Sequence, residues 1–143
     1  GSIDKFLGDG LLVSFGAARD TGAGCAEAGR TALPVAAAAD LWKEARRRAA
    51  QPILDVGIAI TAGEVVFGAV GHGDRLEFTV IGDAVNLAAK LEKYTKIERC
   101  RIIATAEVIA RAQAQGHPPP PGRSIAHAVV EGSPGALDLV AIG

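Results

Sequence analysis

The sequence is poor in several residue types whose abundance would point to particular classes of protein. Its 143 residues include no methionine, one tryptophan, one tyrosine and two cysteines, and aromatic residues make up only 4% of the chain. Cys25 and Cys100 do not form the closely spaced pairs of a zinc site, and two cysteines do not make a disulfide framework. We therefore expect two reduced thiols in a cytoplasmic protein.

The chain also has little excess charge and no long apolar run. Fifteen basic and 16 acidic residues give a formal net charge of −1 at pH 7, so no basic field exists for nucleic acid or an anionic membrane. The basic run 46–48 is typical of a solvated helix face. The longest uncharged apolar stretch, residues 31–39, contains Pro34 and is too short to span a bilayer. We expect no nucleic-acid partner and no direct membrane contact from this segment, and leave open a membrane anchor elsewhere in a parent protein.

What the sequence does contain is the composition of a soluble globular protein. Hydrophobic residues make up 49% and charged residues 22%, and 143 residues suffice for one domain with a core. The chain opens on Gly1 and Ser2 and lacks methionine throughout. We therefore expect either a cut piece of a longer protein or a chain whose natural start has been removed.

The first half of the chain predicts a hairpin, helical structure and two strands. Apolar runs in residues 3–15 flank Gly8-Asp9-Gly10, which is a hairpin-turn signal with Asp9 at the tip. The alanine-rich residues 22–50 predict one long helix or two pieces broken at Pro34. Residues 53–61 alternate as a strand does, and residues 63–71 are expected to be its hairpin partner.

The second half alternates strands and helices. A strand at residues 76–81 leads through Gly82 to a helix that Asp83 is expected to cap. The remaining expected elements are a strand at 101–104, a helix at 106–115, an extended proline run at 118–121 and strands at 126–131 and 137–142. This pattern predicts an α+β fold, a mostly antiparallel sheet with helices packed on it.

Few residues suggest chemistry by their type and position. No phosphate-binding loop ending in Lys-Ser or Lys-Thr is present. Asp9, exposed between glycines at a hairpin tip, is well placed to bind a hard cation such as Mg²⁺. A turn aspartate also caps local amides for purely structural reasons. Lys5 would share a strand face with Asp9 if the pairing ran straight, although it also fits a solvated surface lysine.

A second cluster lies on the helix that follows Gly82. Asn86 and Lys90 are four residues apart, so both lie on one helical face and can reach a single ligand. An amide and a cation one turn apart suit a sugar-phosphate. The alternative is an ordinary solvated face on which Lys90 pairs with Glu92 or Glu98.

Three motifs together resemble one known family. They follow one another along the chain as IDKFLGDGLLVSFG, VGIAITAGEVVFGAVG and LEFTVIGDAVNLAAKLE. The sequence closely resembles the class III nucleotide cyclase catalytic domain, strongly over residues 3–96 and weakly beyond. The resemblance implies a ferredoxin-like palm fold, head-to-tail homodimers and active sites at the dimer interface. It also implies attack of a ribose 3′-oxygen on an α-phosphate, giving a 3′,5′-cyclic nucleotide and pyrophosphate.

The resemblance assigns roles to individual residues. Asp9 matches the second of two metal-binding aspartates, which implies two Mg²⁺ or Mn²⁺ ions per site in the complete domain. Lys5 matches the lysine that reads adenine. Thr79 stands where many members carry a purine-reading aspartate, and threonine there resembles the bacterial, soluble-cyclase-like subgroup; its hydroxyl can still accept from the adenine amino group. Asn86 matches the asparagine that orients the ribose. A guanylate cyclase is expected to carry an acidic residue at position 5 and a cysteine at position 79, so the resemblance favours ATP.

Three departures from the family pattern accompany these matches. Lys90 stands where an arginine normally contacts the α-phosphate in the transition state. The first metal aspartate is expected on a strand upstream of Ile3. Val130-Glu131-Gly132 stands where a basic residue often meets the terminal phosphates, although the alignment there is loose.

These matches and departures lead to two function hypotheses. We expect residues 1–143 to be a single, N-terminally truncated class III catalytic domain that lacks its first strand and helices. As given, the chain should have little or no activity. The favoured function is an adenylate cyclase with regulatory domains in its parent protein. The alternative is a degenerate domain that binds nucleotide or a partner without turnover, and a guanylate cyclase comes third.

Overall fold

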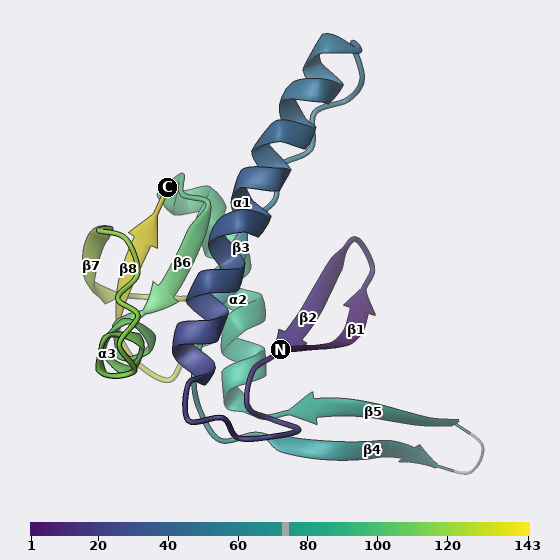
Figure 1. Cartoon of the computed structure of the whole chain (residues 1–143), viewed down its shortest axis with the longest axis vertical. Helices are drawn as coiled ribbons and strands as arrows, with labels where there is room; N and C mark the ends of the chain where they lie inside the picture. The colour runs from purple at the N-terminus through teal and green to yellow at the C-terminus, as the bar shows by residue number, and fades with distance from the viewer. Residues whose placement is uncertain (73–74) are drawn as a thin grey trace.

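The chain forms three helices and eight strands in the part that the structure describes. This computed structural model describes residues 1–72 and 75–143 (Figure 1). In chain order the elements are β1 Ser2–Leu7, β2 Gly10–Ser14, α1 Gly24–Arg48, β3 Ile58–Ile60, β4 Val66–His72, β5 Arg75–Ile81, α2 Asp83–Glu98, β6 Ile102–Thr105, α3 Ala106–Ala114, β7 Arg123–Ala128 and β8 Leu137–Ile142. No helix in the described part has an apolar stretch long enough to cross a membrane.

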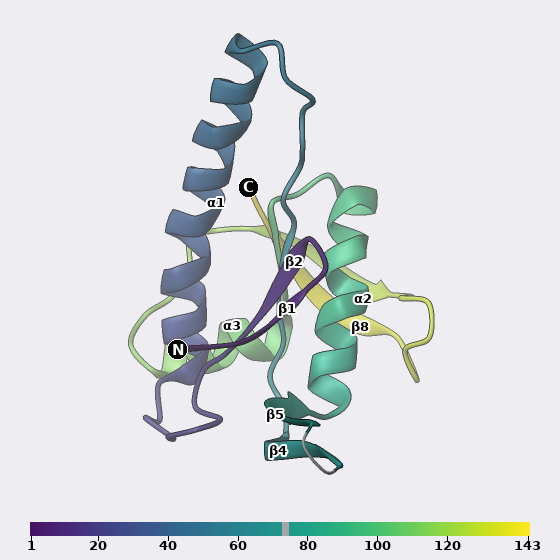
Figure 2. The ribbon, with the colours of Figure 1, turned by 90° about the vertical axis from the view of Figure 1, so that its right-hand side faces the viewer.

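The central sheet has four strands in the order β3-β6-β8-β7. β3 runs parallel to β6, and the other two pairs are antiparallel. α1 and α2 pack on opposite faces of this sheet (Figure 2). Ile102 joins a core cluster with α1 residues, whereas its neighbour Ile103 joins a cluster with Leu91 of α2. This alternation is the period of two that a strand imposes, and it confirms the predicted α+β class.

Two separate two-stranded hairpins, β1–β2 and β4–β5, flank the central sheet (Figure 1). The predicted hairpin of residues 53–61 with 63–71 is wrong. β3 covers only three residues of the predicted strand 53–61, and it pairs with β6. β4 pairs along its length with β5. Parallel pairing needs a long crossover connection, here β4, β5 and α2, and no local signal marks the distant partner.

α1 is one continuous helix that contains Pro34. Pro34 is exposed, whereas Ala32 and Ala36 are buried against the sheet. The missing proline N–H therefore leaves a carbonyl on the outer side of the helix, where water can bind it. This geometry decides between the one-helix and two-piece predictions in favour of one.

Two predicted boundaries need correction. Gly82, not Asp83, is the N-cap of α2, and it makes no side-chain cap hydrogen bond. A Cβ at position 82 would lie 2.7 Å from the Glu64 carbonyl oxygen, so the close approach there requires glycine. β7 begins at Arg123 and ends at Ala128, before Val130, which reaches the core from the following turn. The other predicted strands and helices are confirmed to within one or two residues.

Candidate functional site

Asp9 lies in the two-residue turn of the β1–β2 hairpin, as predicted. Leu7 pairs with Gly10 across the turn, and Gly8 has a φ of 65°. A positive φ at the first central position is the feature that glycine supplies in II′ hairpin turns. Asp9 is exposed, and its turn lies at the end of the hairpin away from β4 and β5 (Figure 1).

Lys5 lies on β1, half-buried and opposite Leu12. A register shift falls between Ile3 and Lys5, after which the pairing runs straight to Leu7. Lys5 and Leu7 therefore share one face of the strand. The neighbouring Asp4 accepts a hydrogen bond from the Ser14 hydroxyl at 3.1 Å, which ties the two strands together at this level.

Thr79 lies on β5, and only 4% of its surface is exposed. Its cross-strand partner on β4 is Gly68, which has no side chain to offer the hydroxyl a hydrogen bond. Within the described residues its Oγ1 has no hydrogen-bond partner. β1 packs beside β5, so the fold brings the strand that carries Lys5 to the strand that carries Thr79. A buried hydroxyl without a partner costs free energy in the ligand-free protein.

The junction between β5 and α2 places Asn86 and Lys90. The Thr61 hydroxyl donates to the Ala84 carbonyl at 2.7 Å, and the backbone N–H of Asn86 donates to the Gly82 carbonyl at 3.2 Å. The first bond ties the first turn of α2 to the segment that follows β3, and the second is a backbone hydrogen bond of the helix's own first turn. Asn86 is exposed and Lys90 half-buried, one turn further along the same face.

Lys90 has a partner that sequence reasoning did not foresee. Its ammonium donates to the Gly132 carbonyl in the loop between β7 and β8. Glu98, one of the two predicted partners, instead pairs with Arg123 at 2.9 Å. The two ends of the Lys90 contact are 42 residues apart, so no spacing rule could have identified it.

The described residues contain no group of three or more histidine, cysteine, aspartate or glutamate side chains that could hold a metal ion. Asp9 by itself can supply one carboxylate to a metal ion at the hairpin tip. Its exposed position and hard oxygen donors fit Mg²⁺ or Mn²⁺ as one ligand among several.

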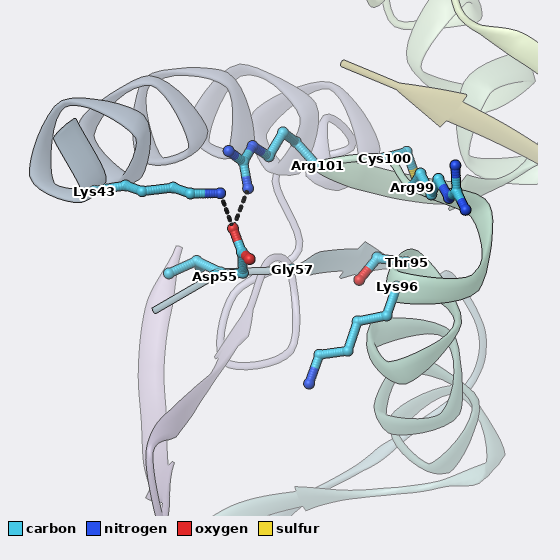
Figure 3. Close-up of a pocket in the computed structure, with 9 residues that line it drawn as sticks. Lys43, Asp55, Gly57, Thr95, Lys96, Arg99, Cys100 and Arg101 are labelled. Carbon is cyan, nitrogen blue, oxygen red and sulfur yellow. Dashed lines mark hydrogen bonds and ion pairs between the residues drawn. The ribbon is translucent and has the colours of Figure 1, made fainter. Parts of the chain in front are cut away.

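A cavity of about 440 Å³ lies at the other end of α2 from Asn86 (Figure 3). Its lining residues are Lys43, Asp55, Val56, Gly57, Thr95, Lys96, Arg99, Cys100 and Arg101. Lys43 and Arg101 point at Asp55 from two directions, and their hydrogen bonds lower the pKa of that carboxyl. None of the predicted site residues lines this cavity. Its members come from distant parts of the chain and give no joint sequence signal.

Both cysteines are free, as predicted. Burial is the main cause that raises the pKa of the Cys100 thiol, and the nearby Glu98 raises it further. Burial likewise raises the pKa of the Cys25 thiol. Both residues are therefore protonated thiols at neutral pH, which makes them poor nucleophiles.

Several curated proteins have sequences similar to this chain. An adenylate cyclase of Anabaena cylindrica is 37% identical over 113 residues, which are 76% of this chain and 22% of the relative. An uncharacterized protein of Mycobacterium tuberculosis strain H37Rv is 36% identical over 112 residues, 78% of this chain and 19% of the relative. The chain thus spans about a fifth of the length of these curated relatives. No model of a known protein family matches the chain.

Solved structures give the same result for the fold. The adenylyl cyclase CyaB from P. aeruginosa has a TM-score of 0.83 and 22% identity, covering all of this chain and 71% of that one. The guanylyl cyclase Cya2 has a TM-score of 0.76 at 24% identity, with 99% and 69% covered. A bacterial light-regulated adenylyl cyclase has a TM-score of 0.70 at 26% identity, with 99% and 38% covered.

The fold and the sequence matches together define a nucleotide cyclase catalytic domain. The chain belongs to the class III nucleotide cyclase family.

Proposed function

We propose that this domain converts ATP to 3′,5′-cyclic AMP and pyrophosphate at a site shared between two copies of the domain. The choice of ATP rests on two side chains of the neighbouring strands β1 and β5. A half-buried Lys5 and a buried, unpartnered Thr79 hydroxyl lie on these neighbouring strands. Adenine offers an amino donor and ring-nitrogen acceptors. The Thr79 hydroxyl can accept from the amino group, and Lys5 can donate to a ring nitrogen.

In this proposal Asn86 orients the ribose and Lys90 contacts the reacting phosphate. An amide both donates and accepts, which suits a sugar oxygen, and the ammonium one turn away balances negative charge that moves onto the phosphate in the transition state. Both side chains project from one face of a helix whose first turn is tied to the segment after β3 by the Thr61 hydroxyl. Fixed placement lowers the barrier by reducing the freedom that the reactants lose.

Asp9 would hold one side of the metal site. Divalent ions bound there lower the pKa of the attacking 3′-hydroxyl and neutralise charge on the triphosphate. The Asp9 turn lies at the far end of its hairpin from β4 and β5. This separation supports a two-copy site, in which Asp9 faces nucleotide held by Lys5, Thr79, Asn86 and Lys90 of the partner subunit.

A product assay on the full-length protein tests the proposed function. With Mg²⁺ or Mn²⁺, ATP should give cyclic AMP, and GTP should give much less cyclic GMP. The double change Lys5→Glu with Thr79→Cys should shift the ratio of the two kcat/KM values toward GTP. If the wild-type protein prefers GTP, the specificity assigned to positions 5 and 79 is wrong.

One observation favours the alternative, a domain that binds nucleotide without turnover. Lys90 stands where the family pattern has an arginine, so the planar fork that holds a phosphate through two hydrogen bonds is absent. Micromolar ATP binding without any cyclic product, in the full-length protein and with both metals, would support this alternative over the enzyme.

A further inference from the structure

The contact between Lys90 and Gly132 joins α2 to the loop between β7 and β8. Lysine carries its charge on a flexible four-carbon stem, with three N–H donors at its end. In the structure one of these donors is used by the Gly132 carbonyl oxygen. Two donors remain for another ligand, and the position of the ammonium is fixed before any ligand arrives.

The geometry of a four-residue turn, residues 130–133, presents this carbonyl. The Ser133 amide donates to the Val130 carbonyl at 2.9 Å, which closes the turn. Gly132 occupies the third position with a φ of 72°, where type II turns favour glycine. Because the bond that closes the turn uses the carbonyl of the first residue, the carbonyl of Gly132 is left for Lys90.

The turn and the helix are held together by the core beneath them. Leu91, next to Lys90, is fully buried, and Val130, the first residue of the turn, is 4% exposed. Both belong to one cluster with Ile103 and Leu139. The helix is therefore anchored in the core at Leu91, next to Lys90, and the turn that carries the Gly132 carbonyl is anchored there at Val130.

We propose that the 130–133 turn positions Lys90 for the reacting phosphate, a proposal that rests on the function proposed above. An arginine fork is rigid and planar, so it loses little freedom when it binds phosphate. A lysine loses more, and the Gly132 carbonyl removes that freedom in advance. Gly132 is thus a positioning residue, which acts through Lys90 and does not touch substrate.

Substitution of Gly132 separates this role from a general effect on stability. A Cβ at position 132 would lie 3.1 Å from the Lys90 Nζ and 3.3 Å from its Cε, so in Gly132→Ala the ammonium must shift by a few tenths of an ångström from its contact. We expect kcat to fall about tenfold with little change in KM. A tenfold change is the size expected when one lysine side chain regains its rotamer freedom. Gly132→Asn adds the same Cβ but tolerates a positive φ, so it should lower kcat equally with less loss of stability.

Gly135 offers a matched control in the same loop. A Cβ there meets nothing within 4 Å, so Gly135→Ala should leave kcat unchanged. In a Lys90→Ala background, Gly132→Ala should cause no further loss of kcat, because its target is gone. An equal loss in both backgrounds, or a wild-type kcat for Gly132→Ala, would overturn the positioning role.

The contact itself can be measured without any turnover. In ¹⁵N NMR of the nucleotide-free protein, the Lys90 ammonium should give a slowly exchanging signal that Lys90→Ala identifies. The signal should weaken in Gly132→Ala and persist in Gly135→Ala. An unchanged signal in Gly132→Ala overturns the contact. If the signal is lost in Gly132→Ala but the wild-type protein makes no cyclic nucleotide, the contact stands, whereas its role in turnover and the proposed function are both overturned.

Discussion

At the scale of single residues, Lys90 carries the clearest departure from its family. If it balances charge in the transition state, Lys90→Ala in the full-length protein should lower kcat and leave nucleotide binding nearly intact. Loss of one charge-assisted contact of this kind costs on the order of 3 kcal/mol, or about a hundredfold in rate. Lys90→Arg should keep or raise the rate. Steady-state kinetics beside equilibrium nucleotide binding measure both effects, and an unchanged rate for Lys90→Ala would leave Lys90 a surface cation.

Thr79 gives a second prediction at the scale of single residues. In the proposed function its hydroxyl helps to bind ATP, whereas in the free protein the same buried hydroxyl lowers stability. The buried Oγ1 has no partner in the described residues, so Thr79→Val removes an uncompensated polar group at nearly constant volume. We expect the free energy of unfolding to rise by about 1 kcal/mol. The KM for ATP should rise at the same time. Thr79→Ser, which keeps the hydroxyl, is the control, and a less stable Thr79→Val would contradict the unpartnered hydroxyl.

At the scale of elements, Asp55 links the segment before β3 to α1 and β6. Lys43 of α1 and Arg101, just before β6, both donate to its carboxylate, and these hydrogen bonds lower its pKa. A lowered folded-state pKa contributes stability above the unfolded pKa of about 3.9, and this contribution is lost as the pH falls through the folded value.

Thermal melts of the wild type and Asp55→Asn test this link. The wild type should melt at the higher temperature at pH 7, and the difference should shrink below about pH 4 and in high salt, because the carboxyl is exposed. Glu44→Gln is the control, since the ion-pair partners of Glu44 among the described residues are Arg47 and Arg48 of its own helix. A difference that is the same at pH 3 and pH 7 would contradict the ion-pair explanation.

At the scale of the whole molecule, the sequence predicts turns and helices well, but it does not predict which distant strands pair. The Gly8-Asp9-Gly10 turn, the long α1 and the β5–α2 junction follow from turn chemistry and helical spacing. The parallel pairing of β3 with β6 does not, because its partners are separated by two strands and a helix.

The candidate site shows the same division. Residue type and spacing alone made Asp9, Lys5, Asn86 and Lys90 candidates, and left each with a structural alternative. Their assigned roles, and the choice of Thr79, come from the family resemblance. The Gly132 contact and the Asp55 ion pairs depend on tertiary packing, so only the fold reveals them.

The central claim, a site shared by two copies, has a direct test in subunit mixing. In the proposed arrangement Asp9→Ala would remove the metal ligand of a subunit, and Asn86→Ala would remove its ribose contact. Each variant alone forms a homodimer in which both sites carry one defect. In a mixed dimer one site collects both defects and the other collects neither, because a two-fold interface has two equivalent sites.

The measurement is the cyclase activity of the two full-length variants before and after subunit exchange, with exchange proven by co-purification of differently tagged copies. Random exchange makes about half of the dimers mixed, and each mixed dimer has one intact site of two. Activity should therefore return to roughly a quarter of the wild-type value. A mixture no more active than the separate variants, despite complete exchange, would contradict the shared site.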